Sequence, residues 1–202
     1  MLIGMLVLGL GTSAQAITIF EDNFNSENGG AGALNYSGFS NWTISSGTVD
    51  LIGNGFFDFY PGNGLYVDLD GSTVDAGLMT SNMIFSPGTY TLSFDLGGSQ
   101  RGDSNDVTVT FGTYSEVFTR ASSAPLALVT RTITIDTSGA LSFNNAGGDN
   151  VGAILDNVSV ATTVPEPSTM ILIGTGIVGM LGFFRGKSKS FNQGSYPTMH
   201  SI

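Results

Sequence analysis

The sequence of 202 residues contains no cysteine and one histidine, His200, and residues 17–163 contain no lysine. The absence of cysteine excludes disulfide bonds, thiolate zinc sites and cysteine nucleophiles. Because histidine and lysine are missing as well, residues 17–163 cannot form a nucleophilic triad or a histidine metal site. We therefore expect a protein that is not an enzyme. A carboxylate pair of a secreted glycoside hydrolase is the less favoured catalytic alternative, since aspartates are present.

Basic residues are also scarce, because the chain has 6 Lys and Arg against 16 Asp and Glu. Half of the bases are Arg185, Lys187 and Lys189, and every acid except Glu166 precedes residue 164. Residues 17–163 therefore carry 15 acids and 3 bases, a net charge of −12. Such a surface repels nucleic acid and anionic lipid, and it attracts divalent cations. Nucleic acid is thereby excluded as a partner.

This acidic segment reads as short strands separated by glycine-rich turns. Polar and apolar residues alternate in 89–96, 106–111 and 130–136, which is the period of a half-buried strand. A further strand is expected over 42–52, broken at Gly47. No helical period is present, and about nine or ten strands fit the spacing. We predict an all-β, two-sheet antiparallel β-sandwich of the jelly-roll type, with a full apolar core.

Residues 1–16 read as a secretory signal peptide. Leu2 to Gly11 is an apolar run of the length that such a signal needs, and Ala14 and Ala16 are the small residues of a cleavage site. We expect export by the secretion machinery and cleavage after Ala16. The exported domain would then comprise residues 17–163.

A proline-rich motif follows the domain and consists of Val164, Pro165, Glu166, Pro167 and Ser168. Its prolines hold the backbone extended, as the cleft of a protease or transpeptidase requires. The run from Met170 to Phe184 predicts a single transmembrane helix, although as a helix it spans only ~22 Å of a ~30 Å hydrocarbon core. Arg185, Lys187 and Lys189 mark the cytoplasmic side, and residues 190–202 form a cytoplasmic tail.

The order of these three parts over residues 164–189 resembles the PEP-CTERM sorting signal. The resemblance implies a bacterium that secretes exopolysaccharide and an exosortase that cuts near the Pro-Glu-Pro site. The protein would be anchored in the inner membrane only in transit and would then reach the cell surface or extracellular matrix. Residues 190–202 depart from the pattern, because such signals usually end soon after the basic residues.

The exported domain is similar to galactose-binding-like jelly rolls that accompany this signal. The stretches that carry the similarity are Asn63–Gly71, Pro87–Gly97 and Gly148–Val160. This resemblance implies a non-catalytic domain with carbohydrate binding as one role, and it names no ligand.

Three acidic residues form a candidate site for a structural Ca²⁺, although no cofactor is required. Glu21 and Asp22 lie in the first expected strand, and Asp156 shares the register of Val158 and Val160, which points inward unless a bulge intervenes. An inward carboxylate needs a partner, and no basic residue is close in sequence. Glu21, Asp22 and Asp156 would supply hard oxygen ligands, with carbonyls added. Alternatively, these acids bond backbone amides or face solvent.

The run Gly55–Pro61 is too apolar for an ordinary loop. Sugar binding requires aromatic faces beside polar groups, so Phe57, Phe59 and Tyr60 are the candidate ligand-binding residues. The alternative is that these aromatic rings pack into the core or cap a sheet edge.

These observations together predict a non-catalytic surface or matrix protein that an exosortase sorts and processes. Weak binding of polysaccharide, such as exopolysaccharide, is the expected activity of the domain. A calcium-dependent lectin is the alternative.

Overall fold

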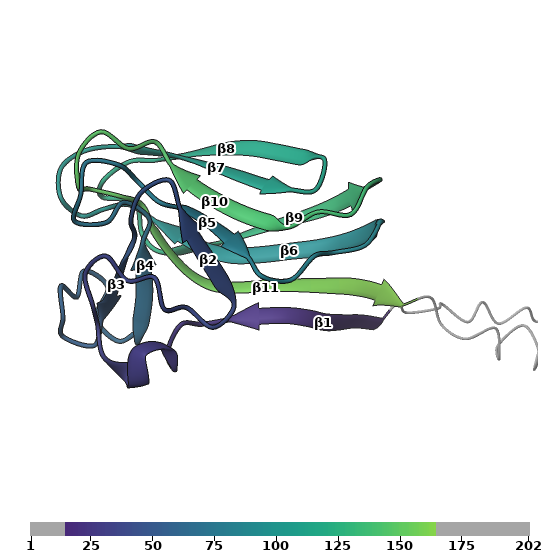
Figure 1. Ribbon diagram of the computed structural model, residues 1–202, viewed down its shortest axis with the longest axis horizontal. Helices are drawn as coiled ribbons and strands as arrows, with labels where there is room; N and C mark the ends of the chain where they lie inside the picture. Colours follow the sequence, from purple (N-terminus) through teal and green to yellow (C-terminus); the bar gives the residue numbers. More distant parts are fainter. Residues whose placement is uncertain (1–14, 165–202) are drawn as a thin grey trace, which may run out of the picture. The chain divides into compact units, whose positions relative to one another are not determined.

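Residues 15–164 are described by the computed structural model of the protein, and they contain eleven strands and one short 3-10 helix (Figure 1). In chain order the elements are β1 (Gln15–Asp22), η1 (Glu27–Gly30), β2 (Trp42–Ser45), β3 (Asp50–Gly53), β4 (Leu65–Asp68), β5 (Leu78–Ser81), β6 (Gly88–Gly97), β7 (Asn105–Phe111), β8 (Tyr114–Arg120), β9 (Ala127–Ile135), β10 (Leu141–Asn145) and β11 (Ile154–Val164). Residues 16–164 form one compact unit with its own hydrophobic core.

Several predicted segments fall outside the described residues. They are the proline-rich motif after Val164, the membrane helix, the basic cluster, the cytoplasmic tail and residues 1–14 of the signal peptide. Within residues 15–164, no helix is long and apolar enough to cross a membrane.

The strands pair into two antiparallel sheets, which we call sheet A and sheet B. Sheet A has the order β3-β4-β11-β6-β9, with β1 paired to β11, and sheet B has the order β2-β5-β10-β7-β8. Figure 1 shows β1 and β11, the first and last strands, side by side. The predicted two-sheet antiparallel sandwich of the jelly-roll type is confirmed.

Gly47 marks the point where the chain passes from one sheet to the other. β2 before it belongs to sheet B and β3 after it belongs to sheet A. Gly47 has a φ of +142°, and a Cβ there would lie 2.3 Å from the carbonyl oxygen of Asp75. Any other residue would therefore clash. The break predicted at Gly47 is thus a change of sheet.

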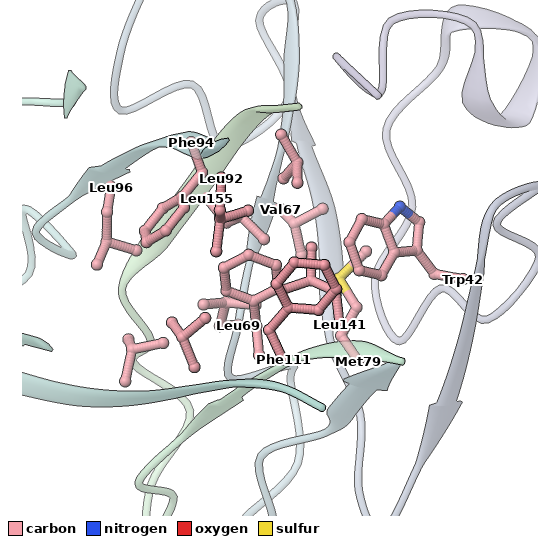
Figure 2. Packing of buried hydrophobic residues seen from close by; sticks show 14 of the residues in the cluster. Trp42, Val67, Leu69, Met79, Leu92, Phe94, Leu96, Phe111, Leu141 and Leu155 are labelled. Atoms are coloured by element: carbon pink, nitrogen blue, oxygen red, sulfur yellow. The ribbon is translucent and has the colours of Figure 1, made fainter. Parts of the chain in front are cut away.

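The alternation predicted for β6 and β7 fills the space between the sheets. The buried inward side chains are Tyr90, Leu92, Phe94 and Leu96 on β6, and Val107, Val109 and Phe111 on β7. From β10, the ring of Phe143 lies 5.2 Å from that of Phe94 and 5.8 Å from that of Trp42. Figure 2 shows Trp42, Phe94 and Phe111 within this cluster. Burial of these aromatic groups is the main source of stability.

Arg131 joins the edges of the two sheets. On β9 it follows the inward register of Ile133, but its guanidinium donates to both carboxylate oxygens of Glu116 on β8, at 2.8 and 2.7 Å. These hydrogen bonds lower the pKa of Glu116 to about 2. Because both side chains are partly exposed, we expect the pair to contribute at most about 1 kcal/mol.

We predict that Phe143→Ala destabilises the domain by about 3–5 kcal/mol, because it removes a ring packed between the two sheets. Phe57→Ala is the matched control, because the side chain of Phe57 is 55% exposed, and its effect should stay below about 0.5 kcal/mol. Urea unfolding followed by tryptophan fluorescence measures both values. Equal effects of the two substitutions would contradict this description of the core.

Candidate functional site

Two hollows are candidates for a binding site. The first, which we call the polar groove, has a volume of about 440 Å³ and is lined by Glu21, Asp22, Asn23, Ser26, Asn41, Asn157, Val158 and Ser159. The second, which we call the aromatic hollow, has a volume of about 180 Å³ and is lined by Leu34, Asp50, Ile52, Phe57, Phe59, Asp68, Ser72, Arg101 and Asn150. Only the second of these two combines aromatic rings with charged groups.

The wall of the aromatic hollow is the loop between β3 and β4. This loop packs on a small second core made by Ile52, Tyr66 and Ile154, each from a different strand of sheet A. Phe56, Phe59, Tyr60 and Leu126 cover that core. The apolar run predicted to be unusual for a loop therefore covers apolar residues of sheet A.

Phe57 differs from its neighbours because its side chain is 55% exposed. Its φ of +47° places it in the left-handed region, and its ring contacts that of Phe56 at 4.9 Å between centroids. Phe57 and Phe59, two of the three predicted ligand-binding residues, both line the hollow. A free aromatic surface is thereby presented beside charged groups.

Tyr60, the third predicted ligand-binding residue, is directed elsewhere. Its hydroxyl lies 2.7 Å from the carbonyl oxygens of Gly98 and Ala124, and Gln100 donates to it at 2.7 Å. Burial raises the pKa of Tyr60, in keeping with a neutral phenol held among backbone groups. Tyr60 therefore anchors the loop behind the hollow and does not line it.

Two carboxylates form the floor of the hollow. Asp50 at the start of β3 and Asp68 at the end of β4 are opposite each other in the antiparallel register. Asp50 accepts hydrogen bonds from the Asn35 amide at 2.6 Å and from the Ser72 hydroxyl at 2.8 Å. Asp68 accepts from the Gly152 amide at 3.0 Å. These donors fix both carboxylates beneath the aromatic rings.

Arg101 connects the floor of the hollow to its wall. Its guanidinium forms an ion pair with Asp68, donates to the carbonyl oxygen of Asn150 at 2.7 Å, and lies 5.4 Å from the centre of the Phe59 ring. Burial raises the pKa of Asp68, and the nearby Arg101 opposes that rise. Arg101 was not among the predicted site residues, although it is one of only three bases in residues 17–163, which also hold 15 acids.

Asp70 lies behind the floor and lacks partners. Its side chain is 0% exposed, and neither carboxyl oxygen has a hydrogen-bond partner. Burial raises its pKa to about 7, and the charge of Asp149 adds to the rise. An ionised carboxylate without a donor costs several kcal/mol, so Asp70 retains a proton at neutral and lower pH.

Asp70 makes the stability of the domain depend on pH. Because its pKa is raised in the folded state, the protonated group contributes stability that is fully present below about pH 4 and is lost as the pH rises through about 7. We expect Asp70→Asn, which cannot ionise, to be more stable than wild type by about 1–3 kcal/mol at pH 8, with little difference at pH 4. Urea unfolding at both pH values measures this difference.

The exposed Asp75→Asn substitution controls for the change in net charge and should follow the wild-type pH dependence. If Asp70→Asn and wild type lose stability in parallel between pH 4 and pH 8, Asp70 is not the responsible group.

In the polar groove, the structure places the three predicted calcium ligands in different surroundings. Asp22 accepts from the Phe24 amide at 2.9 Å, the Asn41 side chain at 3.1 Å and the Trp42 indole at 2.9 Å. Glu21 is exposed, and as the preceding residue of β1 it points to the opposite face of the strand. Asp22 therefore behaves as an acceptor for protein donors.

A β-bulge changes the direction of Asp156. The register with β6 shifts between Asp156 and Ser159, and Asn157 has a φ of +49°. Leu155 and Val158 consequently enter the main core, whereas Asp156 lies opposite Asp95. The bulge named as the exception to an inward Asp156 is therefore present, and its extra residue reverses the alternation.

Asp156 is nevertheless buried. Burial raises its pKa to about 7, and the negative charges of Asp95 and Asp22 contribute. Asn157 partly compensates, because its backbone amide donates to Asp156 at 2.7 Å and its side chain donates to Asp95 at 2.8 Å. Carboxylates from three strands thus approach one another around the bulge.

Calcium at this groove stays a prediction. In the part of the chain that the structure describes, no group of three or more acidic, histidine or cysteine side chains is placed to hold a metal ion. The set of Glu21, Asp22 and Asp156 does not fit a calcium site in this arrangement, because the oxygens of Asp22 are occupied by protein donors.

Thermal melts in EDTA and in excess Ca²⁺ test the calcium prediction. A bound ion would stabilise the folded state by an amount that grows with the logarithm of its concentration relative to the Kd, and a concentration of about 100 Kd would add about 2.7 kcal/mol. A midpoint that rises with Ca²⁺ and returns with EDTA would support calcium. An unchanged midpoint would rule out a structural ion at this groove.

Comparisons with known proteins agree with the motif and the fold. Residues 163–186 match the PEP-CTERM protein-sorting motif, which marks an exported protein that is sorted to the cell surface. The resemblance to that signal is thereby confirmed. Among curated proteins, no sequence matches this chain.

The fold is similar to the K3 cleaved adhesin domain of Lys-gingipain from Porphyromonas gingivalis W83, at 16% identity, covering 73% of this chain and 99% of that one with a TM-score of 0.50. The CBM22-1–GH10 modules of Clostridium thermocellum xylanase 10B match at 15% identity over 73% of this chain and 28% of theirs, with a TM-score of 0.46. The CBM35 from Paenibacillus barcinonensis matches at 17% identity over 62% and 95%, with a TM-score of 0.38. At such identities the likeness shows the fold alone.

Proposed function

We propose that the exported domain is a non-catalytic surface or matrix module that binds polysaccharide at the aromatic hollow. The observation that carries this proposal is the exposed ring of Phe57, which lines the same hollow as Phe59 and the carboxylates of Asp50 and Asp68. Single exposed apolar side chains are common, but two of them, Phe57 and Leu34, line this one hollow, and clustered exposed apolar groups mark interaction sites.

The chemistry of the hollow suits a sugar. An aromatic ring packs against the apolar face of a sugar ring, and carboxylate or carbonyl oxygens accept hydrogen bonds from sugar hydroxyls. The hollow of about 180 Å³ is smaller than the ~300–1,000 Å³ of a usual ligand pocket, so it suits one unit of a longer chain. One sugar unit in a hollow of this size makes few contacts, so we expect weak binding.

The sorting motif supports the proposed location. We infer that the secretion machinery exports the chain, and that an exosortase processes it near Pro165 to Pro167 after a temporary stay in the inner membrane. The domain would then lie at the cell surface or in the matrix, where exopolysaccharide is the polymer at hand. The likeness to a domain described as a cleaved adhesin agrees with such a place.

A panel of soluble polysaccharides tests the proposal with the unit of residues 16–164, which has its own core. We expect at least one polymer to bind without being hydrolysed, and Phe57→Ala to weaken that binding about 10-fold, because an aromatic anchor is lost. Isothermal titration gives the affinity, and reducing-end release reports hydrolysis.

Leu128→Ala is the control, because Leu128 is 68% exposed on β9 and does not line the hollow. Binding that resists Phe57→Ala would place the site elsewhere. Hydrolysis of any polymer in the panel would overturn a non-catalytic role.

A further inference from the structure

We propose that the aromatic hollow selects polysaccharides that carry free amino groups over neutral and uronic-acid polymers. This inference rests on the proposed function and specifies its ligand. Three features support it: the charges around the hollow, the groups that hold the Arg101 guanidinium there, and the pairing of all three basic residues of the domain with other protein groups.

Acidic residues gather around the hollow. Asp50 and Asp68 line it, whereas Asp70, whose backbone amide donates to Asp68, has a raised pKa and adds little charge of its own. Asp103 and Asp149 are close enough to Asp70 for their charges to raise its pKa. A cationic ligand would relieve the repulsion among these groups, whereas an anionic ligand would add to it.

Arg101 shows that this hollow accommodates a cation. Its guanidinium contacts the ring of Phe59, the carboxylate of Asp68 and the carbonyl oxygen of Asn150. An aromatic face, a carboxylate and a carbonyl are also the groups that recognise an alkylammonium ion. The adjacent ring of Phe57 offers a second aromatic surface that is exposed to solvent. Arg101 fills that position itself, so an amino group on a sugar stacked at Phe57 would be attracted by Asp50, the lining carboxylate that is held by amide and hydroxyl donors rather than by a base.

The basic residues of the domain are all engaged by the protein itself. Arg101 is paired with Asp68, and Arg131 holds Glu116 through two hydrogen bonds. Arg120 donates to the carbonyl oxygen of Leu96 at 3.2 Å. A uronic-acid polymer would therefore have to break an existing interaction to gain a cationic partner. It would also approach a domain with a net charge of −12.

Three oligosaccharides test the inference, namely glucosamine, N-acetylglucosamine and galacturonate oligomers of equal length. With the unit of residues 16–164 at pH 7 and low salt, we expect the glucosamine oligomer to bind about 10-fold more tightly than the acetylated one, and the galacturonate oligomer not to bind. Because the preference is electrostatic, raising the salt from 50 to 500 mM should remove most of it.

Asp50→Asn should reduce the preference for the amino sugar, because it removes a charge at the floor while keeping an oxygen that can accept a hydrogen bond. Asp75→Asn is the matched control, since it removes one charge from an exposed position outside the hollow. If both variants lose the preference equally, long-range attraction and not the hollow is responsible.

Should Asp50→Asn melt below the assay temperature, Phe57→Ala provides the second test, because it should weaken binding of both glucosamine-based oligomers.

The outcomes separate this inference from the proposed function. Binding of the acetylated or uronic oligomer with equal or higher affinity would overturn the amino-sugar preference and leave polysaccharide binding intact. If neither these oligomers nor any polymer of the wider panel binds, both the amino-sugar preference and the proposed polysaccharide binding are overturned. A lysine peptide that binds as tightly as the glucosamine oligomer would show recognition of amines without sugar, which overturns the glycan assignment.

Discussion

The ion pair between Arg101 and Asp68 is the interaction on which the candidate site depends. It joins the loop after β6 to the end of β4, and the same guanidinium reaches the loop before β11 through Asn150. Phe59 packs against the other side of that guanidinium. Because Asp68 is only 2% exposed, removing Arg101 would leave a buried carboxyl group without its ionic partner and would raise its pKa further. Two loops, the end of β4 and the aromatic wall therefore hold their positions through one cation.

Scarcity of positive charge shapes the rest of the domain. With 15 acids and 3 bases over residues 17–163, most buried carboxylates cannot have a basic partner. Asp22 and Asp50 are satisfied by amide, indole and hydroxyl donors. Asp156 relies on its neighbour Asn157. Asp70 has no donor, and its raised pKa lets it remain neutral. Backbone and side-chain donors thus replace the cations that this composition lacks.

Local alternation predicted the fold because it depends only on neighbouring residues. The inward residues of β6 and β7, and the break at Gly47, follow directly from periodicity and from the need for a residue without a Cβ. At Asp156 the sequence could name a bulge only as an exception, because a bulge depends on the register with β6, which lies about 60 residues earlier in the chain. A period of two has no means to signal an extra residue.

The candidate site was predicted only in part, because some of its contacts join residues that are far apart in the sequence. The composition of the loop after β3 indicated that Phe57 and Phe59 were unusual, and both line the hollow. The different role of Tyr60 depends on carbonyl groups 38 and 64 residues away. Arg101 likewise meets partners that are 33 and 49 residues distant. Long-range contacts of this kind become visible only once the strand order is known.

The position of the hollow also fits the sorting motif. β11 begins at Ile154, next to the loop that contributes Asn150 to the hollow, and it ends at Val164, inside the matched motif of residues 163–186. Eleven residues of extended strand cover roughly 35 Å. In Figure 1, β3 and β4 accordingly lie at the opposite end of sheet A from the end of β11. A domain held through its C-terminal end would therefore present the hollow at the far end of the sandwich, where a polymer outside the cell can reach it.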